Sequence, residues 1–149
     1  MEFAAIDFET TGYEKGQANE PWQLGFALVR DGEIVERREW FFRTALTPEA
    51  PPIYERWEEF APLLVGRRLV AHNAATERTI LTRLGPLTKW GPWVDTLALA
   101  KARYPRLASY RLSDLCAAFG CVPQLDSRTW HDGLYDAVAC AELALRLAF

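Results

Sequence analysis

Apolar and polar positions fall into short runs whose length and period predict strands in the first third of the chain. Residues 2–8 (EFAAIDF) form an apolar run without a helical period, as expected of a buried central strand. Residues 22–30 and 33–43 flank Asp31-Gly32, which is a strong signal for a two-residue hairpin turn. The chain therefore begins with three predicted strands, of which the second and third form a hairpin.

The rest of the chain predicts helices with two further short strands between them. In chain order we expect a helix at 53–65, a strand at 69–72, a helix at 74–84, a strand near 92–95, and helices at 96–103, 111–119 and 133–148. This order predicts an α/β fold in which helices flank a mixed five-stranded sheet. Functional sites in such sheets gather at the carboxyl ends of strands, and the pattern puts Asp7 and His72 at such ends.

Length and composition indicate a single domain spanning 1–149. A chain of 149 residues can bury one hydrophobic core, and half of the residues are apolar. No apolar run approaches the ~20 residues of a membrane span. The N-terminus lacks the basic start and apolar stretch of a signal peptide. We therefore expect a cytoplasmic protein without a membrane partner.

The three cysteines of the chain match neither a zinc pattern nor a disulfide framework, and we expect them to be buried.

The charge balance limits how the protein can bind nucleic acid. A net charge of −3 argues against binding through bulk positive charge. It does not argue against a nuclease, because catalytic carboxylates count as negative until metal ions neutralise them. Base stacking is another way to bind nucleic acid, and it needs aromatic side chains. The tryptophans that qualify are Trp22, Trp90, Trp93 and Trp130, of which we favour Trp130.

Two acids separated by one residue, Asp7 and Glu9, end the first predicted strand. Their side chains point to the same side of an extended chain, where they repel each other unless a cation neutralises them. The hard cations Mg²⁺ and Mn²⁺ do so. For an isolated pair, a solvated strand end is the alternative. The continuation Thr10-Thr11-Gly12 favours a metal site, since five specified positions recur by chance only once per ~10⁶ sites.

Three segments together resemble the motifs of a known enzyme family. DFETTG (7–12) is similar to the first motif of the DEDDh (DnaQ-like) 3′–5′ exonucleases, the family of the epsilon proofreading subunit. HNAATE (72–77) resembles the second motif, His-Asn-Ala-x-Phe-Asp, with Thr76 in place of the aromatic residue and Glu77 in place of the aspartate. HDGLYD (131–136) matches the third, His-x-x-x-x-Asp. Both histidines of the chain thus stand five residues before an acid at a predicted helix start.

The resemblance covers nearly the whole chain and implies a ribonuclease H-like fold. VDTL (94–97) and YRLSDL (110–115) look like the family's segments between motifs, and we interpret them as a strand end and a helix that dock under the site. His72 is expected to cap and orient the helix that follows it rather than to catalyse. One departure is Gln23, where many members carry a glutamate. It affects the expected positioning of substrate and not the metal site.

The resemblance also implies a mechanism and a set of site residues. Asp7, Glu9 and Asp136 would hold one Mg²⁺ or Mn²⁺ ion, and Asp7 would bridge to a second. Glu77 would support the second ion through an outer-sphere or relaxed contact, because it is one methylene longer than aspartate. Such a pair of ions, ~3.5–4 Å apart, clamps the attacking and leaving oxygens. His131 would act as the general base near neutral pH. The residues expected to contact the terminal nucleotide are Thr10, Thr11, Gly12, Asn73, Thr76 and Trp130.

The predicted reaction is release of nucleoside 5′-monophosphates from the 3′ ends of single-stranded DNA or RNA. We favour DNA, but an RNase of the oligoribonuclease type stays open, because the motifs do not reveal the contacts that read a 2′-hydroxyl. A degenerate, non-catalytic nucleic-acid-binding module is the second alternative. The departures at Gln23, Thr76 and Glu77 favour it, and the intact acids and His131 argue against it. The chain ends directly after the last predicted helix, so a polymerase partner is not supported by the sequence.

Overall fold

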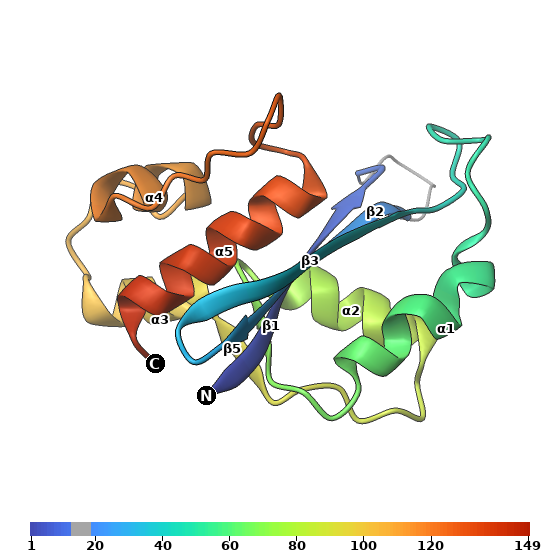
Figure 1. Ribbon diagram of the computed structural model, residues 1–149, viewed down its shortest axis with the longest axis horizontal. Helices are drawn as coiled ribbons and strands as arrows, with labels where there is room; N and C mark the ends of the chain where they lie inside the picture. The colour runs from blue at the N-terminus through green and yellow to red at the C-terminus, as the bar shows by residue number, and fades with distance from the viewer. Residues whose placement is uncertain (13–18) are drawn as a thin grey trace.

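The computed structural model describes residues 1–12 and 19–149, and its centre is a five-stranded mixed sheet (Figure 1). The strands are β1 (Glu2–Thr10), β2 (Pro21–Arg30), β3 (Glu33–Phe41), β4 (Leu69–Ala71) and β5 (Trp93–Asp95). Their order in the sheet is β3-β2-β1-β4-β5, so β1 lies in the middle. β2 is antiparallel to both β1 and β3, whereas β4 and β5 run parallel to β1. The predicted mixed five-stranded sheet is confirmed.

Helices cover both faces of this sheet. They are α1 (Ile53–Leu64), α2 (Ala75–Leu84), α3 (Thr96–Arg103), α4 (Leu112–Phe119) and α5 (Gly133–Leu147). Figure 1 shows α1 and α2 on one side of the sheet and α3, α4 and α5 on the other. Each predicted helix is present with its ends within a residue or two of the expected positions. None of the helices in the described ranges is long and apolar enough to span a bilayer.

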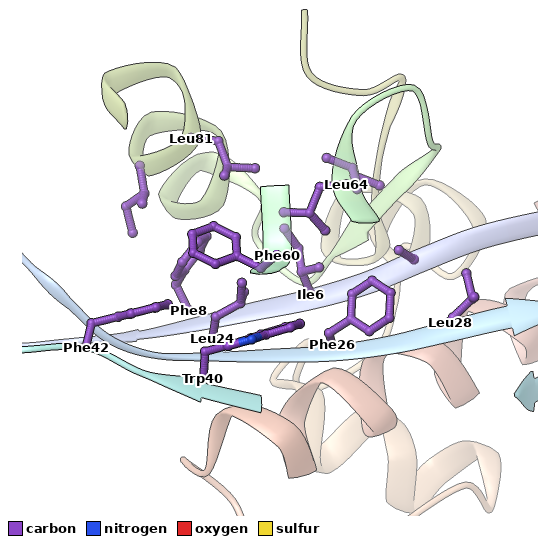
Figure 2. Packing of buried hydrophobic residues seen from close by; sticks show 13 residues of the cluster. Ile6, Phe8, Leu24, Phe26, Leu28, Trp40, Phe42, Phe60, Leu64 and Leu81 are labelled. Carbon is purple, nitrogen blue, oxygen red and sulfur yellow. The ribbon is translucent and has the colours of Figure 1, made fainter. Parts of the chain in front are cut away.

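The alternation of side chains along β1 divides it between the two faces. Even positions point toward α1 and α2, where Ile6 and Phe8 join a core rich in aromatic rings that includes Phe60 of α1 (Figure 2). Odd positions point toward α5, where Phe3 and Ala5 pack against apolar residues of that helix. Because side chains in a strand alternate with a period of two, the acids Asp7 and Glu9 also point toward α5.

The N-terminus of α5 lies against the backbone of β2. A β carbon on Gly25 would lie 1.9 Å from the carbonyl oxygen of Gly133, the first residue of α5. Gly25 pairs with Asp7 in the sheet register. The first turn of α5 therefore begins beside the acidic end of β1.

The three cysteines are buried and free, as predicted. Cys116 and Cys121 lie at the C-terminus of α4, where Gly120 adopts a left-handed conformation with φ of 68°. The N–H of Cys121 donates to the carbonyl of Cys116 at 2.9 Å, which is the six-to-one bond of a Schellman cap. Both side chains belong to the apolar cluster between α3, α4 and α5, so their role is packing.

Candidate active site

Three carboxylates from two elements meet at the end of the central strand. Asp7 and Glu9 come from β1, and Asp136 comes from the first turn of α5. One oxygen of each lies within 4.8 Å of the others. Asp136 is 9% exposed, and the other two are half-buried. The structure thus brings together three of the four acids that the motifs predict as metal ligands.

Crowding and burial change the protonation of these acids. Burial, together with a hydrogen bond to Glu9 and the charge of Glu9, raises the pKa of Asp136 to about 8. Burial and the same neighbour raise the pKa of Asp7 well above its ordinary value. Oδ2 of Asp7 is buried and has no hydrogen-bond partner among the described residues. Repelling carboxylates with an unpaired buried oxygen fit a divalent cation, which takes oxygen ligands and neutralises their charge.

Glu77, the fourth predicted ligand, lies apart from this three-acid cluster. It belongs to the first turn of α2 and is 3% exposed. Its Oε1 accepts a hydrogen bond from the backbone N–H of Phe8 at 3.3 Å, at a point of β1 that β4 does not reach. Its Oε2 is buried and unpaired within residues 1–12 and 19–149. Burial raises the pKa of Glu77 to about 7. One oxygen therefore completes the edge of β1, which leaves the other available to a cation.

The backbone N–H of His131 holds this residue next to Asp136. It lies in the loop before α5 with a left-handed φ of 73°, and its N–H donates to both carboxylate oxygens of Asp136 at 3.3 Å. Asp132 follows it as the N-cap of α5 and accepts from the N–H of Tyr135. A left-handed conformation is unfavourable for a residue with a β carbon, and such strain is common at functional sites. His131 is exposed and lines the same cavity as Asp136.

His72 has a structural role, but not the predicted one. Its Nε2 donates to the carbonyl of Tyr110 at 2.8 Å, and its Nδ1 lies 2.9 Å from the hydroxyl of Thr96. Burial lowers its pKa, which favours the neutral ring. The N-cap of α2 is Ala74, which makes no side-chain cap hydrogen bond. The expectation that His72 caps its own helix is therefore wrong, since the ring instead connects β4 to α3 and to the segment before α4.

The start of α2 is held by an acid from the neighbouring strand. Asp95 accepts hydrogen bonds from the N–H groups of Asn73 and Ala74 at 2.9 and 3.0 Å, and it also caps α3 through Leu97. Asn73 is exposed with a left-handed φ of 61°. Thr76 is half-buried and directly precedes Glu77 in the first turn of α2. The interpretation of the segment around Asp95 as a strand end docked under the site agrees with these contacts.

Hydrogen bonds join the residues directly after β1 to those directly before β2. The N–H of Thr11 donates to the carbonyl of Glu20 at 2.9 Å, and that of Gly12 donates to Asn19 Oδ1 at 2.9 Å. Gly12 has a φ of 85°, and no described atom lies within 4 Å of the position of a β carbon. These N–H groups are therefore used inside the protein and are not free to bind a nucleotide.

A cavity of about 390 Å³ opens beside His131 and Asp136. Its remaining lining residues are Arg111, Leu112, Ser113 and Trp130. Trp130 is half-buried and packs edge to face on Tyr135, with 4.8 Å between the ring centroids. Arg111 is exposed and has no ion pair in the part of the chain that the structure describes. A guanidinium and an aromatic ring next to the acids suit a phosphate and a base.

Comparison with known proteins places these features in a family. The sequence model of the exonuclease family RNase_T matches residues 42–144, which is more than half of the chain. The chain belongs to this exonuclease family. The match includes the second and third motifs, and similar whole-chain relatives extend it to the first.

The relatives by sequence are PolC-type DNA polymerase III proteins. The one from Halalkalibacterium halodurans is 30% identical over 166 residues, which is 98% of this chain and 11% of that protein. The one from Thermotoga maritima is 30% identical over 164 residues, which is 97% of this chain and 12% of that protein. The exonuclease chain therefore spans about a tenth of the length of these relatives.

Solved structures of exonucleases share the fold. Exonuclease X in complex with 5′-overhanging duplex DNA gives a TM-score of 0.73 at 22% identity, over 97% of this chain and 90% of that chain. The nuclease domain of 3′hExo, a DEDDh family member bound to rAMP, gives 0.75 at 16% identity over the same shares. The predicted ribonuclease H-like fold and membership of the DEDDh 3′–5′ exonucleases are confirmed.

The structure explains why this exonuclease departs from its family at Gln23. Gln23 is fully buried opposite Glu9, and its Oε1 accepts the N–H of Gly133 at 2.8 Å. Its Nε2 donates to Glu39 at 3.1 Å and lies 3.5 Å from Asp132. A carboxylate cannot donate to these acids, so the amide is the residue type that fits. Gln23 thus holds the start of α5.

Sequence reasoning did not identify Arg111 as a residue of the site. It treated the segment 110–115 as purely structural, and its helix does pack against α5. The signal that was available is the position of Arg111, immediately before a helix that the resemblance put under the site. Only the folded chain shows that the arginine lines the same cavity as His131.

Proposed function

We propose that the protein is a metal-dependent 3′–5′ exonuclease that hydrolyses single-stranded DNA to nucleoside 5′-monophosphates with two divalent ions and His131 as general base. The observation that carries the proposal is the convergence of Asp7, Glu9 and Asp136 beside an exposed histidine and an open cavity. Like charges are gathered there at a cost in stability, as in sites that depend on perturbed carboxylates.

The residues have separable roles in this proposal. Asp7, Glu9 and Asp136 would hold Mg²⁺ or Mn²⁺, which polarises the scissile phosphate and neutralises developing charge when bound. His131 accepts the proton of the attacking water, and its backbone N–H keeps Asp136 oriented. Arg111 pairs with phosphate oxygens, and Trp130 forms an apolar wall for the nucleotide. Thr10, Thr11, Gly12, Asn73 and Thr76 border the terminal nucleotide from the other side.

DNA is favoured as the substrate by the PolC relatives, which are DNA polymerases by name. The solved neighbours do not decide the matter, because one holds duplex DNA and another holds rAMP. An RNase of the oligoribonuclease type is therefore the alternative within the same chemistry. The non-catalytic module is less well supported, because Asp7, Glu9 and Asp136 converge and His131 holds one of them.

Proofreading beside a polymerase is a second candidate role. The sequence alone gave no support to a polymerase partner, whereas the PolC relatives favour one. A proofreading enzyme removes a mismatched 3′ terminus from a primer–template duplex faster than a matched one. Equal rates on the two duplexes would argue against this role without affecting the exonuclease proposal.

The proposal is tested by digestion of single-stranded DNA and RNA oligonucleotides of one sequence. With Mn²⁺, a 5′-labelled strand should shorten one nucleotide at a time, while a 3′-labelled strand should release labelled mononucleotide at once. EDTA should stop both reactions, and Asp136→Asn purified in parallel controls for a contaminating nuclease. The proposal would be overturned if the 5′-labelled and the 3′-labelled oligonucleotides both stayed intact with Mn²⁺ and also with Mg²⁺. Faster cleavage of RNA than of DNA would favour the RNase alternative.

A further inference from the structure

Trp22 occupies a β-bulge beside the acidic end of β1. Glu9 pairs with Gln23 and Thr10 pairs with Pro21, so Trp22 is an extra residue on β2. Its carbonyl accepts the N–H of Phe42 at 2.9 Å, which keeps it in the ladder with β3. Bulges redirect side chains and are frequent next to active sites. The bulge therefore determines the direction of the Trp22 side chain.

Phe41 of β3 lies on the same face of the sheet as the acids. It pairs with Gln23, which pairs with Glu9, and residues directly opposite each other in antiparallel strands share a face. Two strand spacings put Phe41 about 10 Å from Glu9. Phe41 is 43% exposed, whereas its neighbours Trp40 and Phe42 are buried in the core on the other face.

The rings of Trp22 and Phe41 form a stacked pair. Their centroids lie 6.4 Å apart with an angle of 24° between the planes. Single exposed apolar residues are common on protein surfaces. Here, however, one ring is directed by a bulge, the other is exposed on a strand whose exposed positions are otherwise mostly charged, and both lie close to the carboxylates. The two rings therefore form an aromatic surface about two strand spacings from the acidic end of β1.

We propose that Trp22 and Phe41 are a stacking platform for a base of the substrate strand, upstream of the bond that is cut. The inference rests on the proposed function and extends it to the nucleotides that are not removed. Aromatic rings stack with any base. A protein with a net charge of −3 gains little from bulk electrostatic attraction to nucleic acid, and stacking is a source of affinity that does not depend on net charge. Nucleotides stacked as in a duplex advance roughly 3.4 Å each and those of an extended strand advance farther, so a distance of about 10 Å corresponds to about three nucleotides at most.

The platform predicts that the effect of a substitution depends on substrate length. Trp22→Ala and Phe41→Ala should each lower kcat/KM on a single-stranded decanucleotide about tenfold, mainly through KM. The same variants should cleave a dinucleotide at the parent rate, because a dinucleotide is too short to reach the platform. Trp22→Phe should restore most of the activity on the decanucleotide. The matched control is Tyr54→Ala, which removes a 75% exposed aromatic ring from α1.

Any other result of these assays would contradict either the stacking platform or the proposed exonuclease function. An equal loss on both substrates would show that the two rings only support the site, and no loss on either would show that they bind nothing. If the parent cleaves neither substrate, the proposed function fails. The platform is then still tested by fluorescence anisotropy of a labelled decanucleotide, which should bind Trp22→Ala about tenfold more weakly than the parent and Tyr54→Ala. Equal binding by all three would overturn it.

Discussion

Gly25 and Gly133 bring β2 and α5 together backbone to backbone, because a β carbon on Gly25 would lie 1.9 Å from the carbonyl oxygen of Gly133. Gly25 pairs with Asp7, and Asp136 follows Gly133 by less than one helical turn. The contact therefore sets the separation between the two elements that carry the acids. The two glycines position the acids and contribute no chemical group to the site.

Replacing Gly25 with alanine should separate these elements. The methyl group meets backbone atoms on α5, which cannot rotate away as a side chain could. We expect a loss of about 3 kcal/mol in the free energy of unfolding, at the upper end of overpacking effects, and a loss of activity because Asp136 moves away from Asp7. Urea unfolding and turnover with Mn²⁺ measure the two effects. Val35→Ala, at an exposed position of β3, is the control and should change neither. Full activity in Gly25→Ala would show that the close contact is not required.

Gln23→Glu restores the residue that many family members carry, and here it should be harmful. The amide donates to Glu39 and accepts from Gly133, and a buried carboxylate keeps only the second interaction. It would also face the carboxylates of Glu39 and Asp132. We expect a loss of about 1–3 kcal/mol of stability at pH 8, measured by urea unfolding, with a smaller loss at pH 5, where the new acid can hold a proton. If Gln23→Glu is as stable as the parent at pH 8 and at pH 5, this explanation of the glutamine at position 23 is wrong.

Local patterns predicted most of the fold, and the reason is visible in β1. Its apolar run identifies a central strand, and its alternation alone puts Asp7 and Glu9 on one side. Contacts between distant segments were not predictable in this way. The bond from Phe8 to Glu77 joins residues 69 positions apart, and it exists because β4 ends early. The partners of His72 likewise come from elements whose positions only the folded chain determines.

Without metal, the buried acids of the site should make the stability of the protein fall as pH rises. Asp7, Glu77 and Asp136 all have raised pKa values in the folded protein, with Glu77 at about 7 and Asp136 at about 8. The folded state therefore retains protons that the unfolded chain loses near pH 4. The stability due to these protons is complete below about pH 4 and is lost as pH rises through 7 and 8.

This pH dependence can be measured as the melting temperature in EDTA between pH 5 and pH 9. The Tm of the parent should decline across this range relative to that of Asp136→Asn, which lacks one of the titrating acids. Mn²⁺ or Mg²⁺ added at pH 8 should raise the Tm of the parent more than that of the variant, because the ion binds the folded state. Parallel curves for the two proteins, with no response to either ion, would contradict the assignment of a cation site.

His131→Ala should separate catalysis from metal binding. The backbone N–H that holds Asp136 is unaffected by the substitution, so the acidic cluster should stay in place. We expect turnover to fall by ~10²–10⁴-fold, with the affinity for Mn²⁺ unchanged by calorimetry. The control is His72→Ala, which should cost about 1–3 kcal/mol of stability through its lost hydrogen bonds while the folded fraction stays active. Near-normal rates in His131→Ala would remove this residue from the mechanism.

Glu77 combines a structural contact with a free buried oxygen, so two variants can test the two roles separately. Glu77→Gln keeps an acceptor for the N–H of Phe8 and removes a charge whose burial is unfavourable, so its stability in EDTA should equal or exceed that of the parent. Its activity with Mn²⁺ should nevertheless fall by about 10- to 100-fold, because the acid no longer supports the second ion.

Glu77→Asp should show the opposite pattern. The shorter side chain keeps the charge but cannot reach Phe8 N, which lies 3.3 Å from the glutamate oxygen. We expect it to lose about 1–2 kcal/mol in urea unfolding while it retains more activity than Glu77→Gln under conditions in which both are folded. If Glu77→Gln cleaves substrate as fast as the parent, Glu77 only completes the edge of β1. The resemblance to the second motif would then stop at the helix start and would not extend to its acid.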